Sequence, residues 1–308
     1  MEIMKYEPYK VALVGLDLTE MDDHLIKYTA MISKVLALER ILFVHIAKTL
    51  ELPDQLLKEY PGLLEPLDES IETDLQSKVD AHFGSSGVAV DCIVKEGNSI
   101  EKILRLCRIK DVDLIIMGRK RSLEGSGLVS SKIARRCPCS LLLITEEYNP
   151  EIKNILVPID FSEHSSLAMH CALELSENAK AILLLMHIYR VPKGYYKTGK
   201  SFDEFAEIMK KHTENDCEKF LSTHDFPPDI PCEYVLTDDG KYSKITYALA
   251  EKNNVDMIIM GSKGRTNVSS VLMGSVAEKL VYLDSHIPIL IVKSKGENMG
   301  LLDVLMKI

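Results

Sequence analysis

The sequence of 308 residues contains no tryptophan, only 6% aromatic residues and no low-complexity tract. No uninterrupted apolar run approaches the roughly 20 residues needed to span a bilayer, and the first ten residues lack the charged-then-apolar order of a signal peptide. Basic residues are not in excess, since the formal net charge is -9. A general nucleic-acid binder needs a cationic surface. We therefore expect no membrane span and no nucleic-acid partner.

The seven cysteines do not form a disulfide framework. Their number is odd and their spacing irregular, which favours a reducing compartment. Cys137 and Cys139 are separated by one residue, whereas redox and zinc motifs have two. We interpret these two cysteines as small buried residues and expect a cytoplasmic protein.

Two copies of one pattern make up most of the chain. One constant separation relates four pairs of residues: Asp17 and Asp160, Gly97 and Gly240, Gly118 and Gly261, and Ala134 and Ala277. A constant separation this long indicates a duplicated domain rather than a solenoid. We expect domains at 1–148 and 149–295, a polar linker near 146–152 and an apolar tail at 296–308. The tail could pack on its own protein or dock a partner as a helix.

Short apolar runs alternate with amphipathic stretches in both copies. In the second copy we expect strands near 153–159, 182–188, 232–237, 256–260 and 287–292, and helices near 163–178, 202–223, 241–253 and 274–283. The strands are apolar throughout, as in parallel sheets covered by helices on both faces. Each half is therefore predicted to be an α/β domain with a doubly wound parallel sheet. Ligands of such sheets bind beyond the carboxyl ends of the strands.

A glycine-bearing loop follows the fourth predicted strand of the second copy. It reads GSKGRTNVSSVLMGS, with Gly261, Gly264 and Gly274 before Ser275, where a helix is expected to begin. Glycines let backbone N–H groups approach a ligand, and a helix start favours an anion. The loop is neither a Walker loop nor a dinucleotide fingerprint. A plain glycine turn with a serine N-cap would also fit these residues.

The second half resembles a universal stress protein domain of the ATP-binding type. The loop pattern G-x2-G-x9-G-[ST] is matched without a gap, the first strand ends in Asp160, and the second ends in His187-Ile188. The resemblance extends over both halves, from about residue 8 to residue 294. It implies an adenine-nucleotide hydrolase-like sheet of order 3-2-1-4-5. It also implies pairing of the two domains through their last strands, and a homodimer is conceivable.

The resemblance also implies which residues hold the nucleotide. Adenosine would be surrounded by Pro158, Asp160, Ile188 and Met260, and the phosphates would be held by Gly261, Gly264, Gly274, Ser275 and Val276. Mg²⁺ would be carried by the phosphates of ATP. Two points stay open. Asp160 could instead cap the next helix, and Lys263 and Arg265 could add charge to the phosphates or be solvated loop residues.

The first copy departs from this pattern. It keeps Asp17, Ile46 and Gly118, but Arg121, Ser131 and Lys132 replace Gly264, Gly274 and Ser275. Either an arginine fills this pocket in a copy kept as a structural partner, or side chains bind a different anion there. We expect one nucleotide per chain.

The favoured function is an ATP-binding regulatory protein of the stress response. Any hydrolysis or self-phosphorylation should be slow, because no general base is positioned by the sequence. One alternative is an adenylating or ATP-hydrolysing enzyme of the same fold group, but its S-G-G-x-D-S loop is absent after the first strand. The other is a nucleotide-free dimerising scaffold, against which the intact glycine loop argues.

Overall fold

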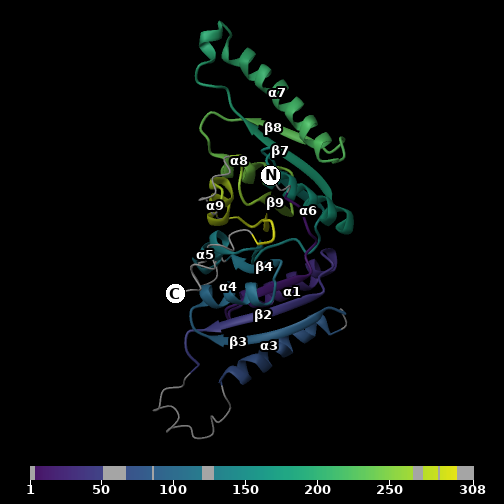
Figure 1. Ribbon diagram of the computed structural model, residues 1–308, viewed down its shortest axis with the longest axis vertical. Coiled ribbons are helices and arrows are strands. Elements are labelled where there is room, and N and C mark those ends of the chain that lie inside the picture. The colour runs from purple at the N-terminus through teal and green to yellow at the C-terminus, as the bar shows by residue number, and fades with distance from the viewer. Residues whose placement is uncertain are drawn as a thin grey trace. The chain divides into compact units, whose positions relative to one another are not determined.

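The computed structural model describes residues 4–50, 67–84, 87–119, 128–265, 273–283 and 285–296. It divides into two compact units (Figure 1). One comprises Glu7–Pro150 with Lys295 and Gly296, and the other comprises Glu151–Ser294 with residues 4–6. The predicted apolar tail lies, beyond Gly296, outside the described residues.

Each end of the described chain belongs to the unit that is formed mainly by the other half of the sequence. Lys295 forms ion pairs of 2.8 Å with both Asp111 and Asp113 in the unit of the first copy. Tyr6 stacks on His170 in the unit of the second copy, with 6.5 Å between ring centroids. The sequence pattern alone did not predict this assignment of the ends.

The first unit is a parallel sheet of order β3-β2-β1-β4-β5. Its strands are β1 (Val11–Leu16), β2 (Arg40–Ala47), β3 (Ala89–Glu96), β4 (Leu114–Arg119) and β5 (Ser140–Thr145). Its helices are α1 (Met21–Val35), α3 (Leu67–Phe83), α4 (Ser99–Ile109) and α5 (Leu128–Arg136). Helices α1 and α3 pack together, as do α4 and α5.

The second unit repeats this arrangement with the order β8-β7-β6-β9-β10. Its strands are β6 (Asn154–Pro158), β7 (Ile182–Tyr189), β8 (Cys232–Leu236), β9 (Met257–Gly261) and β10 (Ile289–Val292). Its helices are α6 (Glu163–Ala179), α7 (Phe202–Thr223), α8 (Tyr242–Lys252) and α9 (Ser275–Tyr282), with a 3₁₀ turn η1 (Tyr195–Thr198). The predicted α/β fold is confirmed, and each unit has the order 3-2-1-4-5.

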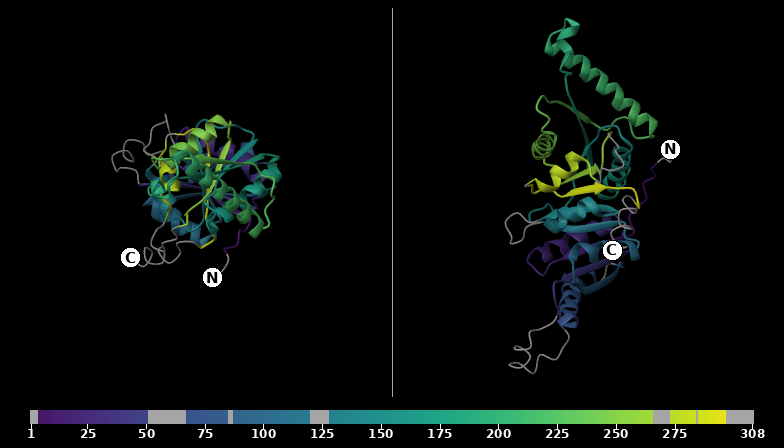
Figure 2. Two further views of the ribbon diagram at one scale, coloured as in Figure 1. Left: turned by 90° about the horizontal axis from the view of Figure 1, so that it is seen from above. Right: turned by 60° about the vertical axis from the view of Figure 1, so that its left-hand side comes forward.

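Helices cover the sheet of each unit on both faces, as the two views of Figure 2 show for the second unit. All residues of β5, β9 and β10 are buried. Strands covered on both faces lose the alternation of polar and apolar residues, which explains their continuous apolar sequence. Within the described part of the chain, none of the helices has the length and apolarity to cross a membrane.

One aspartate in each unit ties the first strand to the fourth. The carboxylate of Asp256 accepts hydrogen bonds from the N–H groups of Lys153 and Asn154, at 2.8 and 2.9 Å. Asp113, the equivalent residue of the first copy, accepts hydrogen bonds from the N–H groups of Lys10 and Val11, both at 2.9 Å. These bonds set the stagger of β6 against β9, so the carboxyl ends of both strands meet at one edge.

Candidate functional site

The residues predicted to surround adenosine lie at the carboxyl ends of three adjacent strands. Pro158 ends β6, Ile188 is the penultimate residue of β7, and Met260 is the penultimate residue of β9. Because β6 lies between β7 and β9, the fold brings these three positions to one edge of the second sheet. Met260 is buried, whereas Pro158 and Ile188 are half-buried.

Asp160 ties the turn after β6 to the glycine loop. Its Oδ1 accepts hydrogen bonds from the hydroxyls of Ser162 and Ser165, at 2.5 and 2.8 Å. Ser162 is the N-cap of α6 and accepts the N–H of Ser165. Asp160 therefore supports the capping serine and is not itself the cap. Its Oδ2 accepts the N–H of Arg265 at 2.9 Å, so both oxygens have partners.

The two glycines at the ends of the loop lie close together. The N–H of Gly274 donates to the carbonyl oxygen of Ser262 at 2.7 Å. A Cβ on Gly274 would lie 3.3 Å from that oxygen and 3.7 Å from the nitrogen of Gly264. A Cβ on Gly264 would lie 2.5 Å from Oδ2 of Asp160. A side chain at Gly264 would thus displace the carboxylate, and one at Gly274 would fill the gap between the loop ends.

Gly261 has a packing role in the structure. It is buried, and a Cβ there would lie 2.5 Å from the backbone oxygen of His164 in α6. Its counterpart Gly118 faces Met21, whose Cγ would be 2.7 Å from an added Cβ. Close packing of the fourth strand against the first helix therefore needs this glycine in both units. This explains why the first copy keeps Gly118 although it has lost the other loop glycines.

Helix α9 begins without a side-chain cap. Its N-cap is Gly274, with φ -66° and ψ 147°, and this residue has no side chain with which to cap the helix. Among the residues that the structure describes, no acceptor is found for the N–H groups of Gly264, Ser275 and Val276. Ser275 is exposed and Val276 half-buried. These N–H groups and the positive end of the helix dipole favour an anion.

The sequence reasoning missed an aromatic stack beside Asp160. The ring of Phe161 stacks on His187, with centroids 4.4 Å apart and planes at 13°, and the guanidinium of Arg265 lies 5.4 Å from the Phe161 centroid. Burial lowers the pKa of His187, so its neutral ring donates from Nδ1 to the carbonyl oxygen of Ile159 at 2.8 Å. The only signal in the sequence was an aromatic residue directly after the strand-end aspartate.

The backbone of Phe161 has an uncommon conformation, with φ 63°. Leu18, at the same place in the first copy, has φ 60°. A positive φ at a non-glycine residue costs free energy and often marks a functional site. Because both copies share it, the conformation belongs to this turn of the fold. The aromatic side chain is what distinguishes the second unit.

The sequence does not decide whether Arg265 adds charge at the site or is a solvated loop residue. In the structure it lies beside Asp160. Besides its N–H bond to Asp160, its Nε donates to the backbone oxygen of Asp160 at 2.5 Å. The side chain is exposed. A cation thus stands between the aspartate turn and the start of the loop.

The equivalent turn of the first unit is built differently. Asp22 stands where the second unit has Ser165, and it accepts the N–H groups of Asp17 and Leu18 at 3.0 and 2.9 Å. Asp22 is 1% exposed, and burial raises its pKa to about 6. Ser131, at the position of Gly274, is buried. Arg121 lies outside the described residues.

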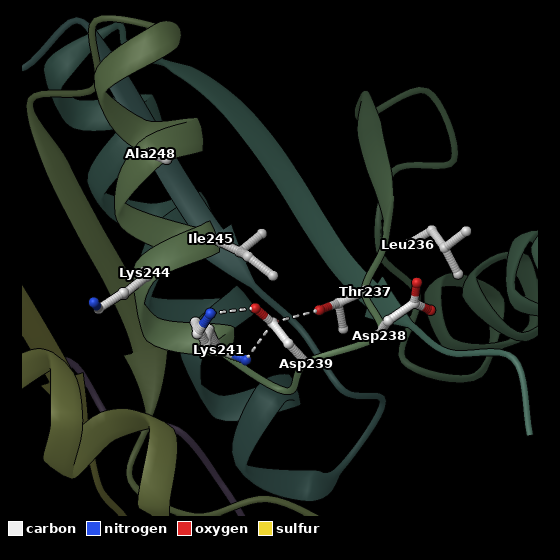
Figure 3. A pocket seen from close by; sticks show the side chains of 8 residues that line it. All are labelled: Leu236, Thr237, Asp238, Asp239, Lys241, Lys244, Ile245 and Ala248. Carbon is white, nitrogen blue, oxygen red and sulfur yellow. Dashed lines mark hydrogen bonds and ion pairs between the residues drawn. The ribbon is translucent and has the colours of Figure 1, made fainter. Parts of the chain in front are cut away.

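An open groove of about 540 Å³ lies beyond the carboxyl end of β8 (Figure 3). Asp239 there accepts hydrogen bonds from the Thr237 hydroxyl at 3.2 Å and the Lys241 ammonium at 2.7 Å. Lys241 holds the pKa of Asp239 below its usual range. The residues predicted to hold the nucleotide do not line this groove, so it is separate from the candidate site.

One serine–histidine pair in the second unit bears on chemistry. The Ser166 hydroxyl lies 3.1 Å from Nδ1 of His224, a pairing that the sequence did not reveal. Ser166 is 5% exposed, so this hydroxyl is not offered to a substrate. Across the described ranges, no group of three His, Cys, Asp or Glu side chains is placed to hold a metal ion.

Fold and site together define a tandem α/β protein with two doubly wound parallel sheets, one of which has Gly264 and Gly274 close together at its carboxyl edge. The model of the universal stress protein family matches residues 8–145 and again residues 151–293. The chain therefore belongs to the universal stress protein family, with two copies of the domain.

Individual relatives agree with this assignment. Universal stress protein MJ0577 of Methanocaldococcus jannaschii is 31% identical over 158 residues, covering 47% of this chain and 96% of that protein. The crystal structure of the Pseudomonas aeruginosa protein PA1789 has a TM-score of 0.69 at 16% identity, covering 97% of this chain and 98% of that one. A universal stress protein from Archaeoglobus fulgidus has a TM-score of 0.62 at 18% identity, covering 92% and 96%. The two structures support the fold over both units.

Proposed function

We propose that the second unit binds ATP and acts as a regulatory module of the stress response. The observation that carries the proposal is the closure of the loop at Gly264 and Gly274 beside the uncapped start of α9. The N–H groups of Gly264, Ser275 and Val276, with the Ser275 hydroxyl, would bind the phosphates. Gly274 would contribute the space for their approach, because its own N–H already bonds Ser262.

Adenosine would lie along the carboxyl ends of β6, β7 and β9. Pro158, Ile188 and Met260 would form its apolar surroundings, and Asp160 would accept a hydrogen bond from the ribose. The Arg265 guanidinium, now 5.4 Å from the Phe161 centroid, would place positive charge near the phosphates. Mg²⁺ would be held through the phosphates of ATP. Gly261 supports this site by allowing β9 to pack against α6.

Rapid turnover is not part of the proposal. Asp160, the carboxylate at the loop, already accepts bonds from Ser162, Ser165 and Arg265. A general base must instead be free to take a proton from the attacking water. The arrangement favours holding ATP over hydrolysing it.

The test is calorimetric titration of the full-length chain with ATP and Mg²⁺, comparing Asp160→Asn with Asp17→Asn. The two aspartates occupy equivalent places in the two copies, so each variant is the matched control of the other. We expect Asp160→Asn to weaken binding at least tenfold and Asp17→Asn to leave the affinity unchanged. Equal effects of the two variants, or no binding by the wild type, would contradict the proposal.

A further inference from the structure

The first turns of helix α7 extend beyond the sheet of the second unit. Figure 1 and the right-hand view of Figure 2 both show the start of this helix away from the strands. The helix packs on β7 and β8. In its first half only Ala206 is buried, whereas its second half has four buried residues, Thr213, Cys217, Phe220 and Leu221. The start of α7 therefore lies outside the core of the unit.

Aromatic side chains hold the 3₁₀ turn η1 on this projecting start of α7. The ring centroid of Tyr195 lies 5.6 Å from that of Phe202 and 6.3 Å from that of Phe205. Phe202 and Phe205 are three residues apart, so they are neighbours on the helix surface. A capping box of Ser201 and Glu204 fixes the first turn of the helix. Local contacts thus give the turn and the helix start a defined arrangement.

The tip of this projection is the segment 190–201 between β7 and α7, where lysines surround an exposed tyrosine. Tyr196 is 66% exposed. Lys193, Lys197 and Lys200 are also exposed and lie within four residues of it in the sequence. None of these three ammonium groups forms an ion pair with a carboxylate that the structure describes. The tip therefore presents uncompensated positive charge beside an aromatic ring.

The charge of the tip is opposite to that of the whole chain. Residues 190–201 include four basic residues and no acidic one, whereas the formal net charge of the chain is -9. The corresponding segment of the first copy, residues 48–66, has two basic and four acidic residues. The positive charge is therefore a property of the second copy and not a requirement of the fold, and it suits an anionic partner.

The acidic residues that follow on α7 do not remove this charge from the tip. Glu204 accepts the N–H of Ser201 at 2.8 Å and is engaged in the capping box. Glu207 has Lys210 and Lys211 three and four residues further along, so these lysines are its neighbours on the helix surface. The charges along the helix therefore alternate in sign, whereas those of the tip do not.

We propose that the tip is a docking surface for an anionic lipid membrane. Lysines are attracted to anionic headgroups, and exposed tyrosine rings favour the headgroup region of a bilayer. A projecting tip can reach a flat surface, whereas a single-stranded nucleic acid is bound in a groove that follows its backbone. The groove of this unit is lined by residues between Leu236 and Ala248 and by none of the tip.

The net negative charge of the chain does not prevent such docking. Electrostatic interactions in water are screened over about 8–10 Å at physiological ionic strength, so the charges nearest the lipid dominate. Each lysine close to an anionic surface strengthens binding roughly fivefold. Three lysines together should contribute about a hundredfold. The contact lies at the membrane surface, needs no membrane-spanning helix, and is independent of nucleotide binding.

Tryptophan fluorescence can report the contact directly, because the chain contains no tryptophan. The full-length variant Tyr196→Trp is mixed with vesicles of phosphatidylcholine alone or of phosphatidylcholine with phosphatidylserine. We expect a blue shift of the emission only with phosphatidylserine, and its loss at high salt. Tyr282→Trp is the matched control, since Tyr282 is 55% exposed in the same unit, and its emission should not shift. No shift in Tyr196→Trp, or equal shifts in both variants, would overturn the proposal.

Vesicle sedimentation of the unlabelled protein tests the lysines. Replacing Lys193, Lys197 and Lys200 by glutamine should weaken binding to phosphatidylserine vesicles about a hundredfold relative to the wild type. The control replaces Lys219, Lys244 and Lys252, three exposed lysines of the same unit, and makes the same change in net charge. It should bind as the wild type does. Equal losses in the two triple variants would refute the assignment to the tip.

Two further outcomes would also contradict the proposal. The wild type should sediment with phosphatidylserine vesicles, and its failure to do so decides the question without any variant. Polyglutamate serves as a probe for an acidic protein partner. A fluorescence shift of Tyr196→Trp with polyglutamate, and none with vesicles, would assign the tip to such a partner instead of a membrane.

Discussion

Replacement of Gly274 by valine tests whether the proposed phosphate site requires empty space at this position. At φ -66° and ψ 147° the backbone is in the extended region that β-branched residues favour, so no positive φ has to be accommodated. The new Cβ would be 3.3 Å from both the Ser262 oxygen and Cα of Lys263. Such contacts require shifts of a few tenths of an ångström. We expect a cost in folding stability near the lower end of the ~1–3 kcal/mol typical of overpacking.

The effect on binding should be much larger. The Cβ would be 3.7 Å from the Gly264 nitrogen, so the valine methyl groups would cover that N–H and the adjacent start of α9. Loss of two hydrogen bonds to charged phosphate, at about 1.5–3 kcal/mol each, amounts to at least about 3 kcal/mol. Since about 1.4 kcal/mol is a factor of ten in affinity, we expect Gly274→Val to weaken ATP binding more than a hundredfold.

Calorimetric titration with ATP and a thermal melt without ligand separate the two effects. Gly194→Ala is the control, because Gly194 lies in the same unit and an added Cβ there meets nothing within 4 Å. That variant should match the wild type in both measurements. If Gly274→Val folds and binds ATP with unchanged affinity, the phosphates do not approach between Gly264 and Gly274, and the reasoning fails.

Three other measurements test separate parts of the structure. Gly261→Ala should lower the free energy of unfolding by more than Gly118→Ala, because its Cβ meets the rigid backbone of His164 while Gly118 faces the flexible Met21 side chain; equal losses in denaturant titrations would contradict this. Asp22 has a folded-state pKa of about 6, above the usual value of 3.8, so its folded form binds a proton more readily and the wild type gains stability as the pH falls from 8 to 5. Asp22→Asn lacks that gain and should be more destabilising at pH 5 than at pH 8, by about 1–2 kcal/mol; a reversed difference would refute the argument. ATP hydrolysis should be slower than the ~1–10³ s⁻¹ of dedicated enzymes, and a phosphate-release rate within that range would show that a catalytic base was missed.

The sequence was sufficient for the fold because its signals are local and repeated. The predicted helix at 202–223 coincides with α7, since Ser201 and Glu204 form a capping box that fixes where the helix begins. The parallel strands could be recognised because burial on both faces leaves continuous apolar runs. The constant separation of Asp17 from Asp160 and of Gly118 from Gly261 then predicted the same architecture twice.

The details of the site depend on contacts between residues far apart in the sequence, which local sequence patterns do not predict. Gly261 is predicted to hold a phosphate, and the structure adds a packing role, because its missing side chain makes room for the backbone of His164, which lies far earlier in the chain. The N–H of Gly274 looked available, yet it bonds Ser262 across the loop. The stack of Phe161 on His187 arises only when two strands meet. Such roles follow from tertiary packing, and glycine spacing alone cannot separate them.

The number of ATP molecules bound by one full-length chain tests the central claim most directly. In the second unit, the described residues offer no acceptor for the first N–H groups of α9, whereas the first unit has buried Ser131 at the position of Gly274. Native mass spectrometry of the protein titrated with ATP and Mg²⁺ should therefore show saturation at one nucleotide per chain. Two equivalent sites, or none at saturating ATP, would contradict the account.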